Sequence, residues 1–433
     1  MKPIFSSMAM LSLILLLIVR NNLVSAQIKN DPPDSSFVRW AKTNAYSLGN
    51  SDFKPIENMA AKTRVVALGE PEHGTNEAPD LRNRMFRYLV ENSGFTAIVL
   101  EADFAKARIA ADYINGGPGS IEQAAKALSW GKPSAENIEL IRWMREYNQQ
   151  PAHKIKIRLY GMDMEMIGVP GDTASSHPSI DETFAYLRKI DGKTAEHFSG
   201  VLAPFLDRLS SANYPKFSNR EHELLSLSLD ALIDTLGQKR LTYIKASSKP
   251  AYDWAYQNAI VARQTDHMVR LLPPDIPGKI PPDGWRAASD RDSAMAENVI
   301  WILQRESKIL IYAHDAHVKN AVTKGGVWDV FQQAPKATGQ YLRHALGDKI
   351  VIFGISFAPT FDIKQPSSLE NVLIQTGKSN FLINFRAADL DPKVVEWLAT
   401  QRPMQMNNVT YMNLTIGSAF DGIIYLEKKH QSQ

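Results

Sequence analysis

The sequence predicts an α/β protein with a largely parallel central sheet flanked by helices, and with an inserted helical lobe that covers the cleft. Short apolar runs alternate with amphipathic helical segments, which is the order typical of parallel sheets. Four of the predicted strands end in a polar, titratable residue, namely Glu70, Glu101, Asp163 and His314. A stretch at about 178–275 is helical almost throughout, and it interrupts the alternation of strands and helices.

The composition is that of a globular protein with enough apolar residues for a large core. The chain has 433 residues, of which 44% are hydrophobic and 22% are charged, and its formal net charge is +3. It contains no polybasic run and no alternation of aromatic and basic residues, so nucleic acid is not a predicted partner. The absence of cysteine excludes thiol catalysis, disulfides and thiolate metal sites.

Residues 1–26 have the pattern of an export signal. Lys2 supplies the positive charge, Met8–Val19 is an apolar run too short for a comfortable membrane span, and Val24–Ala26 suits cleavage before Gln27. Arg20, Asn21 and Asn22 lie unusually close to this cleavage site, so an uncleaved anchor is the alternative. We expect a mature chain of residues 27–433 that is exported to the periplasm or the medium and has no membrane span.

The stretch from Arg64 to Asp103 organises the rest of the prediction. It begins with a buried strand over Arg64–Gly69, continues with a helix over about Pro79–Asn92, and reaches a second buried strand over Thr96–Leu100. Gly94 is a plausible stop for the helix. The first strand is followed by Glu70, Glu72 and His73, and the second is followed by Glu101 and Asp103. Two strands that each end in acids suggest a site at the carboxyl edge of a sheet.

Arg82 interrupts the apolar side of the helix in this stretch. At 100° per residue it projects into the stripe formed by Leu81, Met85, Phe86 and Leu89. A guanidinium stays charged and is costly to bury unless a carboxylate meets it, and Glu70 and Glu101 are the nearest candidates. The alternatives are a purely structural ion pair or a side chain that extends out to solvent.

The other elements follow in order along the chain. A helix over Ser35–Tyr46 precedes the central stretch. After it we expect helices at Asp103–Ile114, Ile121–Trp130 and Ala135–Asn148, a strand at Ile155–Tyr160, lobe helices at Glu182–Ile190, Phe198–Ser211, Ser218–Leu236 and Ala251–Leu272, a helix at Arg291–Glu306, and strands at Lys308–Ala313, Ile350–Ser356 and Gly422–Leu426.

A histidine beside carboxylates suits general base catalysis. Imidazole titrates near neutral pH, and a carboxylate on one ring nitrogen fixes its tautomer and orientation. We therefore predict that His73 takes a proton from water and that Glu70 or Glu101 orients it. His314 or Arg82 would stabilise the oxyanion that forms when this water attacks a carbonyl carbon. A single histidine in a glycine-bounded turn can also be purely structural.

A metal site is the chief alternative. Nitrogen and oxygen ligands are available from Glu70, His73, Glu101, His314 and His317. However, no HExxH helix occurs, and the charge of Arg82 in the same pocket would oppose a cation, so no metal or other cofactor is predicted. A serine hydrolase is disfavoured because Gly354–Ala358 lacks the final glycine of G-x-S-x-G. Neither a P-loop nor a dinucleotide fingerprint is present.

Several motifs together resemble the erythromycin esterase family, a group that includes succinoglycan-biosynthesis-like hydrolases. They are G-E-x-x-H-G-x-x-E at Gly69–Glu77, an arginine nine residues after the histidine, G-F-x-x-I-x-L-E at Gly94–Glu101, WMREYN at Trp143–Asn148, YGMD at Tyr160–Asp163, RDSAMAEN at Arg291–Asn298, AHDAHV at Ala313–Val318 and FDGIIYL at Phe420–Leu426. The resemblance covers nearly all of the chain beyond residue 60, except the segment at about 178–275.

The resemblance implies a hydrolase that opens an ester, with a macrolide lactone and hence antibiotic resistance among the expectations. It implies that His314 is catalytic and that His317, Asp163 and Glu77 bind substrate or support the site. Asp315 stands where the family pattern more usually has Asn; this carboxylate would raise the pKa of the neighbouring histidines or hydrogen-bond within the loop. The lobe would set specificity.

Two other functions stay open on the same residues. One is a metal-dependent hydrolase of another substrate, and the other is a non-enzymatic binding protein of the cell envelope. The expected partner in the leading interpretation is a small-molecule ester or lactone. The sequence does not predict an oligomeric state.

Overall fold

The computed structural model describes ten ranges of the chain: residues 35–49, 52–129, 132–164, 177–206, 208–209, 214–272, 281–358, 365–387, 390–406 and 410–427. The predicted signal peptide at residues 1–26 lies outside the described residues.

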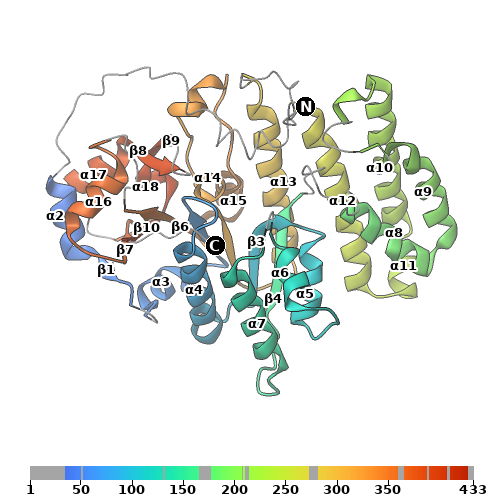
Figure 1. Cartoon of the computed structure of the whole chain (residues 1–433), viewed down its shortest axis with the longest axis horizontal. Helices are drawn as coiled ribbons and strands as arrows, with labels where there is room; N and C mark the ends of the chain where they lie inside the picture. The colour runs from blue at the N-terminus through green and yellow to red at the C-terminus, as the bar shows by residue number, and fades with distance from the viewer. Residues whose placement is uncertain are drawn as a thin grey trace.

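An eight-stranded sheet forms the centre of the molecule (Figure 1), in the order β1-β7-β10-β6-β2-β5-β3-β4. The strands from β10 to β4 run parallel, whereas at one edge β7 pairs antiparallel with β10 and β1 pairs antiparallel with β7. The largely parallel sheet predicted from the alternation of elements is thereby confirmed. Its strands are β1 (Tyr46–Ser47), β2 (Val65–Glu70), β3 (Ala97–Asp103), β4 (Arg158–Asp163), β5 (Ile309–His314), β6 (Ile350–Phe357), β7 (Phe381–Asn384) and β10 (Gly422–Leu426).

Helices cover both faces of this sheet, and each layer has its own apolar core. The first layer, which we call the α4 layer, comprises α3 (Lys54–Ala60), α4 (Glu77–Ser93), α5 (Ala107–Ile114), α6 (Ile121–Lys126) and α7 (Ala135–Gln149). The second, the α13 layer, comprises α2 (Ser35–Asn44), α13 (Trp285–Leu303), α14 (Asp315–Val318), α15 (Thr338–Leu346), α16 (Leu369–Leu373), α17 (Pro392–Ala399) and α18 (Ile416–Ala419). Short 3₁₀ turns occur at η2 (Tyr214–Lys216), η3 (Gly326–Val330), η4 (Gly347–Lys349) and η5 (Ile374–Thr376).

Strand alternation decides which layer each side chain meets. In β2, Val65 and Ala67 pack in the α13 layer, whereas Val66 and Leu68 pack in the α4 layer. Because successive side chains point to opposite faces of a strand, Glu70 lies on the same face as Val66 and Leu68, toward the α4 layer. In β3, Ala97 and Val99 belong to the α13 layer, so Glu101 continues that side. Glu70 and Glu101, at the ends of the two strands on either side of β5, therefore face opposite layers.

The predicted helical lobe is present and has a core of its own. It consists of α8 (Pro178–Ile190), α9 (Gly192–Leu206), α10 (Asn219–Gln238), α11 (Arg240–Ala246) and α12 (Lys249–Arg270), of which α11 was not predicted. Phe104 and Met164 from the body, and Ala287 and Ala294 from α13, complete this core. In Figure 1 the lobe lies beside the β4 edge of the sheet. That the lobe covers the cleft stays a prediction.

Other sequence predictions need correction. Strand β4 begins at Arg158 rather than at Ile155, whose side chain is 66% exposed. Neither β7 nor the antiparallel hairpin of β8 (Gln401–Met406) and β9 (Thr410–Thr415) was predicted. In β8 the apolar alternation is hidden by Arg402 and Pro403, because proline is unusual inside a strand. Among the described residues, no helix is both long enough and apolar enough to span a bilayer.

Candidate active site

Four functional candidates lie at adjacent strand ends. Glu70, His314, Glu101 and Asp163 come from β2, β5, β3 and β4, which are consecutive strands of the sheet. Glu70 and His314 are direct register partners. The predicted convergence at the carboxyl edge is therefore observed, although the residues are far apart in sequence. Their catalytic roles stay predictions.

His73 presents one ring nitrogen to Glu70 and most of its side chain to solvent. Its Nδ1 lies 2.8 Å from Glu70 Oε1, and its side chain is 58% exposed. Since the carboxylate can only accept, Nδ1 carries the proton and Nε2 of the neutral ring is left as a base. The surrounding protein removes part of the hydration of the ring and so opposes its charged form, but the hydrogen bond to Glu70 and the charges of Glu70 and Glu101 raise the pKa of His73. Gly74, with φ of 79°, turns the chain sharply after His73 toward α4.

Arg82 is buried as predicted, but its predicted carboxylate partner is wrong. Its guanidinium donates to Asn83 Oδ1 at 2.8 and 3.0 Å and to Asn137 Oδ1 at 3.0 Å. It also lies 4.8 Å from the centre of the Tyr312 ring. The Tyr312 hydroxyl in turn donates a short hydrogen bond to Glu70 Oε2. Within the described ranges, Arg82 therefore contacts the tyrosine that binds Glu70, and it forms no ion pair with Glu70 or Glu101.

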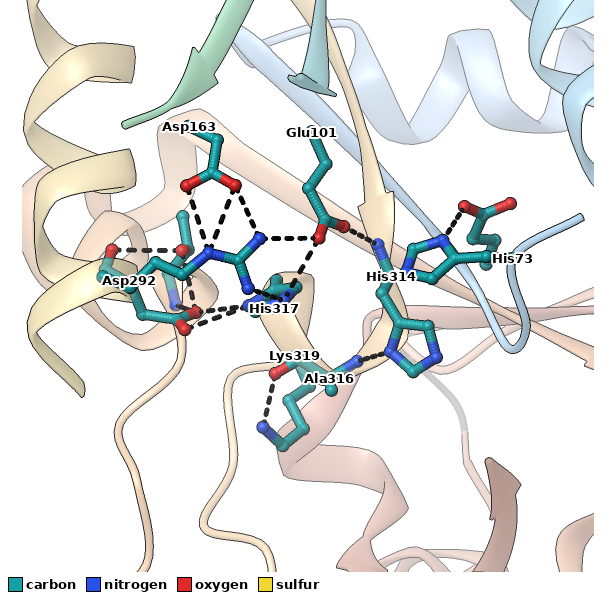
Figure 2. Close-up of polar contacts among 11 residues, drawn as sticks. His73, Glu101, Asp163, Asp292, His314, Ala316, His317 and Lys319 are labelled. Carbon is teal, nitrogen blue, oxygen red and sulfur yellow. Dashed lines mark hydrogen bonds and ion pairs between the residues drawn. The ribbon is translucent and has the colours of Figure 1, made fainter. Parts of the chain in front are cut away.

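His314 is held in one tautomer by the backbone. The Ala316 N–H donates to His314 Nδ1 at 3.0 Å, so a neutral His314 carries its proton on Nε2. The His314 ring is 5.1 Å from the His73 ring, measured between centroids. The base nitrogen of His73 and the N–H of a neutral His314 thus belong to neighbouring rings (Figure 2).

Glu101 belongs to a different network from His73. Its Oε2 accepts the backbone N–H of His314 at 2.8 Å, and its Oε1 accepts from Arg291 Nη2 at 3.1 Å. Although burial favours the neutral carboxyl, the charges of His317, His73 and Arg291 hold the pKa of Glu101 well below its ordinary value. Of the two carboxylates considered for orienting His73, Glu70 makes the hydrogen bond and Glu101 is directed elsewhere.

Arg291 and His317 complete the Glu101 network, of which Figure 2 labels Glu101, Asp163, Asp292 and His317. Arg291 makes three contacts to the fully buried Asp163, the shortest at 2.6 Å. His317 lies between two carboxylates, with Nδ1 2.9 Å from Asp292 Oδ1 and Nε2 3.4 Å from Glu101 Oε1. Against the effect of burial, these charges raise the pKa of His317 to about 10. A doubly protonated ring then donates to both carboxylates.

Three residues of these networks were given no role from the sequence. Arg291 and Asp292 begin the motif RDSAMAEN, which was recognised only as part of the family pattern. Asp292 also accepts the backbone N–H and the hydroxyl of Thr338, which fixes the carboxylate that holds His317. Tyr312 gave no signal, because an aromatic residue inside a buried strand is normally core.

The remaining predicted residues have different surroundings. Asp163 is the fully buried partner of Arg291, and Glu77 is the half-buried first residue of α4. Asp315 is fully buried and faces β6 and β2. It accepts weakly from the Ile355 N–H at 3.4 Å, and a Cβ on Gly69 would lie 1.8 Å from its Oδ1. This hydrogen bond runs to β6, whereas one within the loop was predicted; the predicted effect of Asp315 on the pKa of the neighbouring histidines stays a prediction.

The candidate metal ligands are largely engaged in hydrogen bonds. Among the described residues, no group of three His, Asp or Glu side chains is arranged to hold an ion. His314 Nδ1 accepts a backbone N–H, while Glu70 and Glu101 are each bound by several donors. A cation at these atoms would have to displace those donors, and that the site needs no metal stays a prediction.

Comparisons with known proteins identify the family. The family model described as Erythromycin esterase matches residues 90–429. The chain belongs to the erythromycin esterase family. The match begins after the motif that contains His73 and Arg82, and it includes Glu101, Asp163, Arg291 and His314. The recognition made from the sequence motifs is confirmed.

Several relatives extend over most of the chain. It is 25% identical to erythromycin esterase type II of Escherichia coli over 414 residues, which is 88% of this chain and 93% of that protein. A Bacillus cereus protein of known crystal structure has a TM-score of 0.77 at 23% identity, covering 92% of this chain and 98% of its own. The erythromycin esterase EreC, solved as a mutant in its open conformation, has a TM-score of 0.68 at 18% identity, covering 89% of this chain and 96% of its own. The family makes the chain an ester hydrolase with a small-molecule substrate, and these structures share its fold.

Proposed function

We propose that the protein is an exported esterase in which His73 activates water for direct attack on an ester, with macrolide lactones as the first substrates to test. The observation that supports this proposal best is the pairing of His73 with Glu70. Only one ring nitrogen of His73 is used by this hydrogen bond at 2.8 Å, and the exposed ring offers the other to a substrate water.

The reaction needs one base and one oxyanion donor. His73 Nε2 takes a proton from water as the water oxygen bonds to the carbonyl carbon. The resulting oxyanion accepts from Nε2–H of His314, whose tautomer is set by Ala316. The tetrahedral intermediate then breaks its ester C–O bond, and the protonated His73 returns the proton to the leaving alkoxide. A lactone would gain one water and open to a hydroxy acid.

The geometry of the site favours direct attack of water on the ester over a mechanism with a serine acyl-enzyme intermediate. Ser356, the serine of the incomplete G-x-S-x-G pattern, is 1% exposed, and its hydroxyl lies 3.5 Å from buried Glu370. This places it away from any incoming ester. Arg82 is enclosed by Asn83, Asn137 and Tyr312, so His314 is the better of the two oxyanion donors considered.

The proposals of export and of a macrolide substrate are supported by the sequence and by a relative, and not by the geometry of the site. Export is supported by the signal pattern of residues 1–26. The macrolide is supported by the name of the Escherichia coli relative, at 25% identity. Mass spectrometry of the protein recovered from the periplasm or medium should give a chain that starts at Gln27, and retention of the intact N-terminus would contradict cleavage.

The decisive experiment incubates the mature protein with erythromycin, with and without EDTA, and follows the gain of one water by mass spectrometry. We expect hydrolysis that survives EDTA and is lowered by about a hundredfold or more in His73→Ala. Loss with EDTA would instead support a metal-dependent hydrolase. An intact macrolide would redirect the search to a panel of other esters and lactones, and failure across that panel would support the non-enzymatic binding protein.

A further inference from the structure

Tyr312 is the second hydrogen-bond donor to the carboxylate that holds His73. It lies on β5 opposite Leu68 of β2, two residues before the end of each strand, and its side chain is 5% exposed. Both residues belong to the α4 layer, the side that Glu70 also faces. Tyr312 donates to Glu70 Oε2 while His73 donates to Glu70 Oε1. The carboxylate is therefore held at both oxygens.

Arg82 supports the tyrosine from the opposite side. Its guanidinium lies over the Tyr312 ring at 4.8 Å, in a site that is 3% exposed. Asn83 and Asn137 accept its hydrogen bonds, so the cation is fixed against the ring rather than free to meet a substrate. A cation over a phenol ring makes the hydroxyl a stronger donor. Burial and the charge of Glu70 nevertheless keep the pKa of Tyr312 well above its ordinary value, so the hydroxyl keeps its proton.

We propose that Tyr312 is a positioning residue for the proposed esterase reaction: its hydroxyl, polarised by Arg82, fixes the Glu70 carboxylate and thereby sets the orientation and basicity of His73. The proposal rests on the proposed role of His73 as the base. It gives Arg82 a function without substrate contact, which agrees with its enclosure between α4 and α7. A carboxylate that shares its charge with a tyrosine attracts the proton of His73 less strongly.

We call the contacts Arg82–Tyr312–Glu70–His73 the relay. Other charged groups also surround the relay, and the test leaves them unchanged. Glu101 from β3 and His317 from α14 act on His73, whose ring also lies beside that of His314. Asp315 from α14 acts on Tyr312, while Glu136 and Asp80 act on Arg82. Removing only the Tyr312 hydroxyl leaves each of these groups in the protein, so a change at His73 can be assigned to the lost hydrogen bond.

The test is the substitution Tyr312→Phe, with Tyr160→Phe as its matched control. Tyr160 also donates to a buried glutamate, Glu306, at 2.7 Å, but from a different strand and outside the relay. The pKa of His73 is measured by NMR on protein with ¹³C-labelled histidine, and its resonance is assigned by its loss in His73→Gln. We expect Tyr312→Phe to raise this pKa by about half a unit to one unit, the worth of one hydrogen bond, and Tyr160→Phe to leave it unchanged.

Two further measurements distinguish a positioning role of Tyr312 from a nonspecific structural effect of the substitution. In a Glu70→Gln background, Tyr312→Phe should no longer move the pKa of His73, because the carboxylate that transmits the effect is gone. In kinetics on a hydrolysed ester, Tyr312→Phe should lower kcat by about three- to tenfold with KM unchanged, and should move the acidic limb of the pH profile upward. Thermal unfolding confirms that both phenylalanine variants fold.

The outcomes distinguish this proposal from the proposed function. An unshifted His73 in Tyr312→Phe, or a shift that persists in the Glu70→Gln background, overturns the role of Tyr312. The NMR titration needs no substrate, so it decides that role even if the wild-type protein hydrolyses no ester. Inactivity of the wild type against the ester panel overturns the proposed function instead.

Discussion

Glu70 and Glu101 are chemically the same group at nearly adjacent strand ends, yet they build two different regions. The Glu70 region contains His73, Tyr312 and Arg82, and it ends in an imidazole that is 58% exposed. The Glu101 region contains Arg291, Asp163, His317 and Asp292, and its histidine side chain is only 16% exposed. One region leaves a ring nitrogen available for chemistry, whereas the other binds both ring nitrogens of its histidine to carboxylates.

The difference follows from strand parity and from what each layer supplies. Glu70 continues the face of Val66 and Leu68, where α4 contributes a single arginine that stacks on a tyrosine. Glu101 continues the face of Ala97 and Val99, where α13 contributes Arg291 and Asp292 together. In the proposed reaction, the Glu70 carboxylate, with one neutral donor and one histidine, tunes the base. A carboxylate among several buried charges holds the sheet edge and the His314 backbone in place.

Replacing His73, the exposed histidine of the Glu70 region, is the strongest test of the difference between the two regions. We expect His73→Ala to lower kcat by about a hundredfold to ten-thousandfold, the usual worth of a general base, while stability changes by less than about 0.5 kcal/mol. The matched control is His267→Ala, since His267 also pairs with a carboxylate, Asp290, at 2.8 Å and is 55% exposed. Steady-state kinetics and urea unfolding measure both effects. Equal losses of activity in the two variants would contradict a specific role for His73.

Replacing Arg291, the arginine of the Glu101 region, should mainly lower stability, whereas replacing His73 should mainly lower activity. Arg291→Met leaves Glu101 and the fully buried Asp163 without their shared cation, so we expect a loss of about 3–5 kcal/mol in the free energy of unfolding. Arg208→Met is the control, because Arg208 is 48% exposed and pairs with Glu221 in the lobe, where about 1 kcal/mol or less is expected. Similar urea midpoints for the two variants would show that the Glu101 region is not a structural network.

The sequence predicted the elements of this site better than the contacts between them. Apolar runs and strand alternation located β2, β3 and β5, and the rule that ligands lie at carboxyl strand ends brought Glu70, His314 and Glu101 together. These features are local, or they depend only on parallel pairing. They therefore follow from patterns that a single sequence contains.

The partners of the buried charges could not be predicted in the same way. The helical periodicity correctly placed Arg82 on the buried side of α4, but a carboxylate was expected where the structure has an aromatic ring and two asparagines. Arg291 is more than a hundred residues from Asp163, and only the packing of α13 against β4 brings them together. Such pairs depend on side-chain reach across layers, which periodicity does not encode.

The pH dependence of stability should separate the two regions further. The pKa of His317 is raised to about 10, so the stability that its charge contributes is complete below about pH 6.5 and is lost as the pH rises through 10. We expect wild-type protein to lose stability between pH 7 and 10, and His317→Gln to be less stable at pH 7 but to change less over this range. Lys319, whose pKa burial lowers to about 8, titrates in both proteins, so their difference reports on His317. Parallel curves in urea unfolding would contradict this assignment.

The smallest expected effect concerns Asp315, which lies between the two regions in sequence but belongs to neither network. Burial raises its pKa well above the ordinary value, and its Oδ2 has no hydrogen-bond partner among the described residues. The contribution of the protonated Asp315 carboxyl to protein stability is complete below about pH 4, and it is lost as the pH rises through the raised pKa. Asp315→Asn keeps the acceptor for the Ile355 N–H without a charge, so we expect a gain of about 1–2 kcal/mol near neutral pH and none at pH 4. Activity should stay within about twofold, because the carboxyl faces β6 rather than the histidines; a large loss of kcat would instead make Asp315 part of the His314 and His317 chemistry.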